Sequence, residues 1–167
     1  GLITSIKMLR LARGPWAISP DDRFVYSYNA EQGALGWAKL AKDGKPEYGA
    51  SVDIVKPMGL DPKTYNKGYA GFVSGKLNVS PDGRHLYMSY AYKNLFGAAV
   101  FSRDAKNGSV SFLRKLNLGK SGKRGKLVLN SSGTGGFFYT GARSGTVGYF
   151  SRNAQTGDLK VEKTIRF

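Results

Sequence analysis

Short runs in which apolar residues alternate with small or polar ones recur along the chain, and turn-forming residues separate them. A two-residue period of this kind is typical of β-strands that pack within a sheet protein. Two further apolar runs, at 109–113 and 158–161, follow glycine-containing turns and are interpreted as outer strands. The main pattern predicts strands at residues 16–18, 24–28, 35–39, 77–79, 85–90, 98–102, 127–129, 137–140 and 147–151.

The strands and turns repeat as one larger unit. A turn reads Ser-Pro-Asp-Asp-Arg at 19–23 and Ser-Pro-Asp-Gly-Arg at 80–84, with a degenerate copy, Asn-Ser-Ser-Gly, at 130–133. A second element reads Phe-Ser-Arg-Asp-Ala-Lys-Asn-Gly at 101–108 and Phe-Ser-Arg-Asn-Ala-Gln-Thr-Gly at 150–157, with a looser copy at 37–44. Each unit therefore has four strands, and repeats at this spacing are typical of stacked β units such as propeller blades.

The repeat predicts an all-β fold of three propeller blades, each a four-stranded antiparallel sheet, at residues 14–56, 72–118 and 126–167. Residues 1–13 match the outer strands of the later units and are interpreted as an extra outer strand from a preceding blade. We therefore expect a single partial domain that belongs to a larger propeller.

Three blades are not expected to close a propeller, so the remaining blades or a second copy should cover the ends. Soluble monomers avoid large exposed apolar patches. Five aromatic side chains of the first and third units are expected to require this cover: Trp16, Trp37, Phe137, Phe138 and Tyr149.

Charge is the strongest functional signal. Lys and Arg number 26 against 11 acidic residues, which gives a formal net charge of +15. Such a field favours anionic partners, here an acidic protein surface or other subunits of an assembly, with nucleic acid as a further alternative. Cationic side chains on outer strands also block edge-to-edge aggregation, which is the simpler explanation. No apolar stretch approaches the roughly 20 residues that span a bilayer, and these features do not indicate a compartment.

Two connections between units carry basic residues, and long loops in compact domains are often functional. Residues 57–71 interleave lysines with tyrosines, and residues 119–126 are rich in glycine and cations. Such loops could clamp phosphates and stack bases, whereas the alternative is a solvated linker. The predicted partner-binding residues are Lys63, Tyr65, Lys67, Tyr69, Lys120, Lys123, Arg124 and Lys126.

No catalytic residue, cofactor-binding motif or metal site is predicted. His85 is the single histidine, and its place in a strand beside Leu86 favours a packing role. A Ser-His-Asp relay would need a nucleophile and a carboxylate beside it, and no Gly-x-Ser-x-Gly elbow is present. The acidic residues fall in turns or are scattered, and Gly119-Lys120-Ser121 lacks the first glycine of a phosphate-binding loop.

The motifs at 80–87 and 100–108, with their copies, resemble the lactonase-type β-propeller family, which includes the propeller-type 6-phosphogluconolactonases. The resemblance covers nearly the whole chain. It implies a seven-bladed propeller, of which this chain supplies about three blades, and it implies lactone hydrolysis. None of the motifs here matches the family's catalytic His, Arg and acidic residues.

Three functions are consistent with these observations. The high charge without catalytic residues favours a non-enzymatic propeller scaffold that docks to an anionic partner in an assembly. The alternative is a fragment of a lactonase-like hydrolase whose active residues lie in other blades. An RNA-binding module is a further alternative, supported by the basic and aromatic loops.

Overall fold

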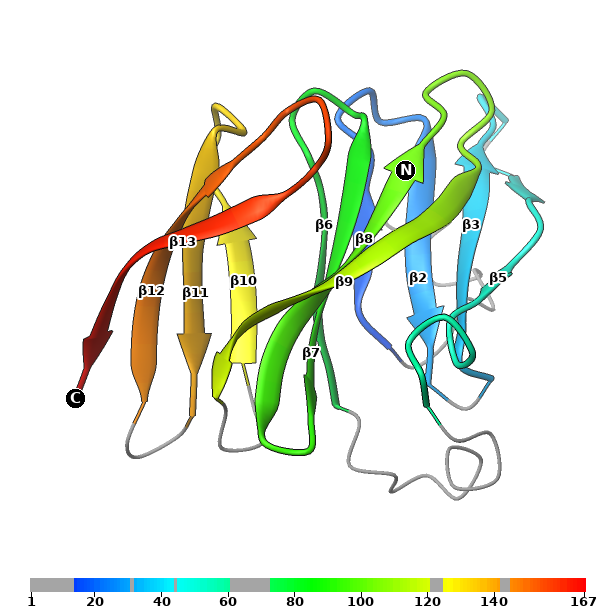
Figure 1. Cartoon of the computed structure of the whole chain (residues 1–167). Coiled ribbons are helices and arrows are strands. Elements are labelled where there is room, and N and C mark those ends of the chain that lie inside the picture. Colours follow the sequence, from blue (N-terminus) through cyan, green and yellow to red (C-terminus); the bar gives the residue numbers. More distant parts are fainter. Residues whose placement is uncertain (1–13, 31, 44, 61–72, 121–124, 142–144) are drawn as a thin grey trace.

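The computed structural model describes residues 14–30, 32–43, 45–60, 73–120, 125–141 and 145–167, and these form three antiparallel sheets that stand side by side (Figure 1). No helix occurs among these residues. The predicted all-β class of propeller blades is therefore confirmed, while the extra outer strand expected at 1–13 lies outside the described residues.

The first sheet contains β1 (Trp16–Ile18), β2 (Phe24–Asn29), β3 (Ala34–Leu40), β4 (Pro46–Tyr48) and β5 (Val52–Asp53). Its fourth position is divided, because β4 pairs with one half of β3 and β5 with the other half. Gly49 lies at the break, where a Cβ atom would come within 2.0 Å of the Trp37 ring. The close approach of this ring to the backbone accounts for the glycine at this point.

The second sheet is formed in order by β6 (Val73–Val79), β7 (His85–Tyr92), β8 (Leu95–Arg103) and β9 (Val110–Lys120). The third sheet is formed in order by β10 (Gly125–Leu129), β11 (Gly135–Thr140), β12 (Thr146–Arg152) and β13 (Leu159–Arg166). All nine strands predicted from the main pattern and both predicted outer strands are present, although most extend further than predicted.

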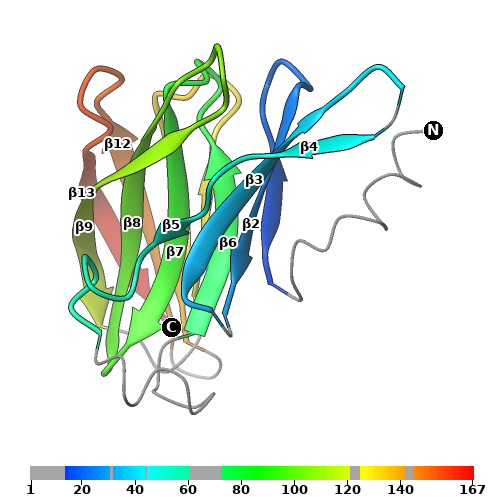
Figure 2. The ribbon, with the colours of Figure 1, turned by 90° about the vertical axis from the view of Figure 1, so that its right-hand side faces the viewer.

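The core lies between the sheets. One cluster joins the first sheet to the second and includes Phe24, Tyr26, Leu86 and Phe101. A second cluster joins the second sheet to the third, and in it Phe96 stacks on Phe138 with ring centroids 5.7 Å apart. Viewed from the side of the first sheet, β5 runs across the outer part of the molecule (Figure 2).

The start of the connection after the first sheet belongs to this core. Ile54, Met58 and Leu60 are buried in the cluster between the first two sheets. Lys115 of β9 donates a hydrogen bond from Nζ to the Met58 carbonyl oxygen at 3.2 Å. The first residues of the 57–71 connection therefore fill space between two blades.

The five aromatic residues expected to need outside cover fall into two groups. Phe138 is buried beneath the second sheet, and Trp37 is partly buried with its ring edge-to-face on Phe24 at 5.8 Å. The expectation is therefore wrong for these two. Trp16, Phe137 and Tyr149 are exposed, as expected of residues at the open ends.

Candidate functional site

The second and third sheets are joined by a buried arginine, Arg152, at the end of β12. Its Nε donates to the Tyr87 hydroxyl at 2.8 Å, and its Nη1 donates to the Gly133 carbonyl at 2.9 Å. Its Nη2 donates to both carboxylate oxygens of Asp82, at 3.1 and 2.9 Å. Tyr87 and Asp82 belong to the preceding sheet, so a single guanidinium connects two blades.

The same guanidinium also contacts His85. Nη2 of Arg152 lies 2.9 Å from Nδ1 of His85, and because guanidinium can only donate, the imidazole is neutral with its proton on Nε2. The turn after β12 closes over this ring. A Cβ atom on Gly157, whose φ is +77°, would lie 2.6 Å from the ring, and the Gly157 carbonyl accepts a hydrogen bond from the Tyr87 hydroxyl at 2.9 Å.

The first and second sheets are joined in the same way by Arg103 at the end of β8. It donates from Nε to the Tyr26 hydroxyl at 2.6 Å, from Nη1 to the Gly83 carbonyl at 2.9 Å, and from Nη2 to Asp21 at 3.4 Å. Phe24 stands where His85 stands in the next blade, and the guanidinium lies 5.2 Å from its ring centroid. We call each of these Arg–Tyr–Asp arrangements an interblade clamp.

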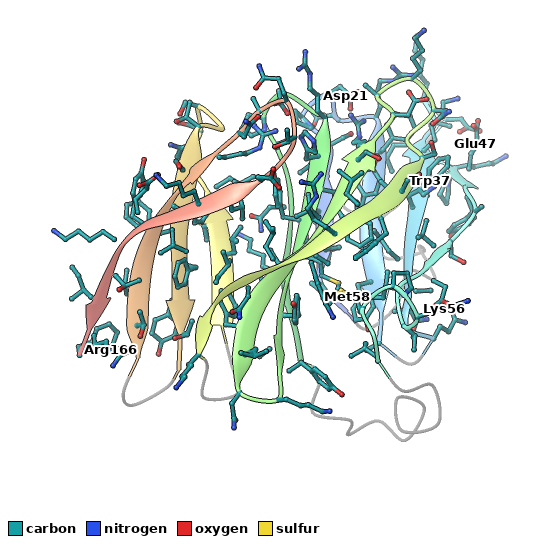
Figure 3. All side chains as sticks on the ribbon, viewed as in Figure 1. Asp21, Trp37, Glu47, Lys56, Met58 and Arg166 are labelled. Atoms are coloured by element: carbon teal, nitrogen blue, oxygen red, sulfur yellow. The ribbon has the colours of Figure 1, made fainter. Side chains whose placement is uncertain are left out.

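Asp21, which belongs to the first clamp, lies at the upper end of the sheets in Figure 3, whereas Arg166 at the end of β13 lies near the lower end. The clamps therefore sit at the end of the blades that carries the Ser-Pro-Asp turns. These turns are built as predicted, since Asp82 accepts hydrogen bonds from the Ser80 hydroxyl at 2.6 Å and the Arg84 amide at 3.1 Å.

The clamp shifts the protonation equilibria of its members. Burial alone would raise the pKa of Asp82, but hydrogen bonds from Ser80, Arg84 and Arg152 lower it overall. Burial raises the pKa of the Tyr87 hydroxyl. Burial and the positive charge of Arg152 lower the pKa of His85. At neutral pH the clamp thus consists of a carboxylate, a guanidinium, a neutral phenol and a neutral imidazole.

Perturbed pKa values often mark functional sites, but buried ion pairs perturb them too. In the clamps, each guanidinium edge already has a protein acceptor. The interblade clamps therefore stabilise the packing of adjacent sheets. The predicted packing role of His85 agrees with its burial, and its contact with Arg152 adds an electrostatic function to that role.

The first strands of the three sheets, β1, β6 and β10, lie next to one another and form the inner edge of the blades. The side-chain amide of Asn78 on β6 donates a hydrogen bond to the Leu127 carbonyl oxygen on β10 at 3.0 Å. The backbones of β6 and β10 approach each other closely at Gly75 and Gly125. A Cβ atom added to Gly75 would lie only 2.7 Å from the Gly125 carbonyl oxygen. In a propeller this inner edge surrounds the central channel, where ligands have access to several blades at once.

Two lysines occupy equivalent positions on this inner edge. Lys76 follows Gly75 and Lys126 follows Gly125, and both side chains are exposed. No salt bridge with either lysine is present among the described residues. We call Lys76 and Lys126 the inner lysine pair, and it is the candidate binding site of this chain.

Of the predicted partner-binding residues, the structure describes Lys120 and Lys126. Lys120 ends the outer strand β9, and Lys126 lies in the inner strand β10. Both are exposed, and their role in binding an anionic partner stays a prediction. The others lie outside the described residues: Lys63, Tyr65, Lys67, Tyr69, Lys123 and Arg124.

Within the described ranges, no group of three or more His, Cys, Asp or Glu side chains is placed to hold a metal ion. The same part of the chain contains no helix that is long and apolar enough to cross a membrane.

The sequence analysis missed both clamp arginines and Lys76. In the sequence, Arg103 and Arg152 stand out only as parts of a turn motif. The available signal was the repeated Phe-Ser-Arg at 101–103 and 150–152, in which a cation recurs at the end of a buried strand. For Lys76, the signal was the Gly-Lys pair at 75–76, which recurs at 125–126 before each inner apolar run.

Comparison with known protein families identifies the family to which this fold belongs. A family model described as "Lactonase, 7-bladed beta-propeller" matches residues 58–166, which is more than half of the chain. The chain belongs to this lactonase family of β-propellers. The matched residues include both clamp arginines and the inner lysine pair. A comparison with curated proteins finds no match.

Solved structures show the same fold. A periplasmic gluconolactonase from Pseudomonas aeruginosa is 19% identical, with a TM-score of 0.69 over 90% of this chain and 38% of that one. A candidate 6-phosphogluconolactonase from Bacteroides fragilis is 24% identical, with a TM-score of 0.66 over 90% and 38%. One from Bacteroides uniformis is 21% identical, with a TM-score of 0.65 over 90% and 39%. The chain thus spans about two fifths of the length of these structures.

Proposed function

We propose that this chain forms part of a propeller-type lactone hydrolase, with the inner edge of its sheets contributing to the substrate site. The observation that carries the proposal is the family match over 58–166. This match supports the hydrolase alternative of the sequence analysis better than the non-enzymatic scaffold. The names of the structural neighbours, gluconolactonase and 6-phosphogluconolactonase, support a sugar lactone as the substrate class.

In lactone hydrolysis, water adds to the ring carbonyl, the ring C–O bond breaks, and a sugar acid is released. The carbonyl oxygen gains negative charge in the transition state, and the product carries a carboxylate. Cations close to the reacting group stabilise such charge. We propose that the inner lysine pair attracts the anionic groups of the substrate and product, while residues of other blades complete the catalytic machinery.

The pair is best suited to a lactone that also carries a phosphate. Lysine binds phosphate as a point charge, and two lysines on neighbouring strands can contact one phosphate from two sides. Lys76 and Lys126 follow Gly75 and Gly125, whose backbones approach each other closely on neighbouring inner strands. We therefore propose a phosphorylated sugar lactone as the preferred substrate.

Isothermal titration of the chain with 6-phosphogluconate and with gluconate tests this proposal through binding, because residues of other blades complete the catalytic machinery. We expect 6-phosphogluconate to bind more tightly than gluconate, and the K76A/K126A double variant to lose that difference. K163A provides a matched control, because it removes an exposed lysine from the outer strand β13. Equal binding of the two sugar acids by the parent chain would remove the phosphate from the proposal. Absence of binding of either sugar acid would count against a sugar-lactone site on this inner edge.

A further inference from the structure

Positive and negative charges are distributed unevenly between the two ends of the sheets. The lower end lies opposite the turns at 19–23, 80–84 and 130–133, and Figure 3 shows Lys56 and Arg166 toward it, with Asp21 and Glu47 toward the upper end. Within the described residues, every salt bridge lies in the upper half of the sheets. In the same part of the chain, Asp53 is the one acidic residue at the lower end. The cations of the lower end therefore produce a positive field that few acidic groups offset.

Three exposed lysines of the lower end belong to adjoining segments. Lys93 lies in the turn between β7 and β8, Lys120 ends β9, and Lys126 lies near the start of β10. Lys120 is paired with the first residue of β8. The ring of Phe96, the second residue of β8, packs so closely on β10 that a Cβ atom on Gly125 would lie 2.3 Å from it. The hairpin that carries Lys93 and the strand that carries Lys126 thus meet at this end.

Lys93 has a backbone conformation that is unfavourable for lysine. Lys93 and Asn94 are the two central residues of the β7–β8 hairpin, with φ of +46° and +64°. Glycine, asparagine and aspartate are favoured at such positions, so Asn94 follows the preference and Lys93 does not. In the β2–β3 and β11–β12 hairpins, the positive φ values among the described residues belong to Gly33 and Gly141. A strained residue of this kind indicates that its side chain has a function.

The side chain of Lys93 supplies an exposed positive charge at the tip of the hairpin. Its Nζ lies 5.2 Å from the centroid of the Tyr92 ring, a distance at which the ring attracts the ammonium group. No salt bridge joins Lys93 or Lys120 to an acidic residue of the described chain. The charge of Lys93 is therefore available to an anion that approaches the lower end.

We propose that Lys93 and Lys120 form the entrance through which an anionic sugar lactone reaches the inner lysine pair. β6 and β10 run from the lower end toward the turns at 80–84 and 130–133, so the pair lies on the lower part of the inner edge. A phosphorylated lactone that arrives from this end meets exposed cations first, whereas at the upper end it meets charges that are already paired. A field of one sign raises the association rate of oppositely charged ligands. The role of the entrance rests on the lactone site proposed above.

Phosphorus NMR line shapes of 6-phosphogluconate, recorded during titration with the chain, give its association and dissociation rates. K93G/K120A should lower the association rate about threefold to tenfold at low salt, because the removed charges attract the anion before contact. The dissociation rate should change little. At about 1 M salt the Debye length falls to about 3 Å, so the variant and the parent should then associate at the same rate.

The matched control is K42A/K106A, which removes the same charge from exposed lysines in turns of the upper end. This control should associate at the parental rate. Unchanged association in K93G/K120A, or an equal decrease in K42A/K106A, would overturn the entrance and leave the lactone site in place. A parent chain that does not bind 6-phosphogluconate would overturn both.

The single variant K93G separates attraction of the ligand from support of the fold. Glycine adopts positive φ without strain, so K93G should melt at the same temperature as the parent or higher. Its association rate with 6-phosphogluconate should nevertheless fall. A lower melting temperature together with parental association would show that Lys93 acts in the fold, and would overturn its part in the entrance.

Discussion

Arg152 donates a hydrogen bond from Nη2 to Nδ1 of His85 at 2.9 Å, across the boundary between the second and third sheets. The contact needs a neutral imidazole, because a protonated ring would place two cations in hydrogen-bond distance. His85 is 4% exposed and is the single histidine of the chain. It therefore links the stability of one interblade boundary to pH.

Stability should fall as the pH decreases below about 6.5, the ordinary pKa of histidine. Burial and Arg152 lower the pKa of His85 in the folded chain, so the unfolded chain binds the proton first. Because the unfolded state then holds more protons, the free energy of unfolding decreases by up to about 1.4 kcal/mol per pH unit until the folded-state pKa is reached. Urea unfolding between pH 7.5 and 5 measures this slope, and H85Q should flatten it. An unchanged slope in H85Q would assign the pH dependence to other groups.

Removing a clamp arginine should cost far more than removing an exposed one. In R152M, the Tyr87 hydroxyl and Asp82 lose a buried partner, and breaking a buried pair costs about 3–5 kcal/mol. R114M removes an ion pair with Asp158 in which both side chains are more than 40% exposed, and should cost about 0–1 kcal/mol. Equilibrium unfolding in urea compares the two. Equal losses would show that the clamp contributes no more than a surface pair.

R103M tests whether the two clamps are equivalent. Arg103 lies 3.4 Å from Asp21, whereas Arg152 lies 2.9 Å from Asp82 and also contacts His85. We therefore expect R103M to destabilise the chain less than R152M does. The comparison uses the same substitution at equivalent positions, so differences in the unfolded state largely cancel. A larger loss in R103M would show that its ring contact with Phe24 outweighs the longer ion pair.

The strands and turns could be predicted from the sequence because both are local. Apolar alternation, together with the apolar runs after the glycine-containing turns, located every strand of the second and third sheets. The predicted Ser-Pro-Asp turn is stabilised by hydrogen bonds to Asp82. The clamps could not be predicted in this way, because Arg152 and Asp82 lie 70 residues apart along the chain. The divided fourth strand of the first sheet was also missed, since it depends on the contact between Gly49 and Trp37.

The closing turns should be sensitive to a single methyl group. G157A adds a Cβ about 2.6 Å from the His85 ring, at a residue whose φ of +77° is itself strained for alanine. G119A is a useful comparison, because its φ is also positive but nothing lies within 4 Å of the added Cβ. We expect G157A to be the more destabilising by about 1–3 kcal/mol, as in other overpacked sites. Similar melting temperatures would show that the turn shifts to accommodate the methyl group.

The neighbouring residues Phe137 and Phe138 should respond in opposite ways to truncation, because successive side chains of a strand point to opposite faces of the sheet. Phe138 is 1% exposed and stacks on Phe96, so F138A should lower the free energy of unfolding by about 3–5 kcal/mol. Phe137 is 58% exposed, so F137A should change the stability of the isolated chain by less than about 1 kcal/mol. A large loss of stability in F137A would mean that Phe137 packs against other residues of its own chain.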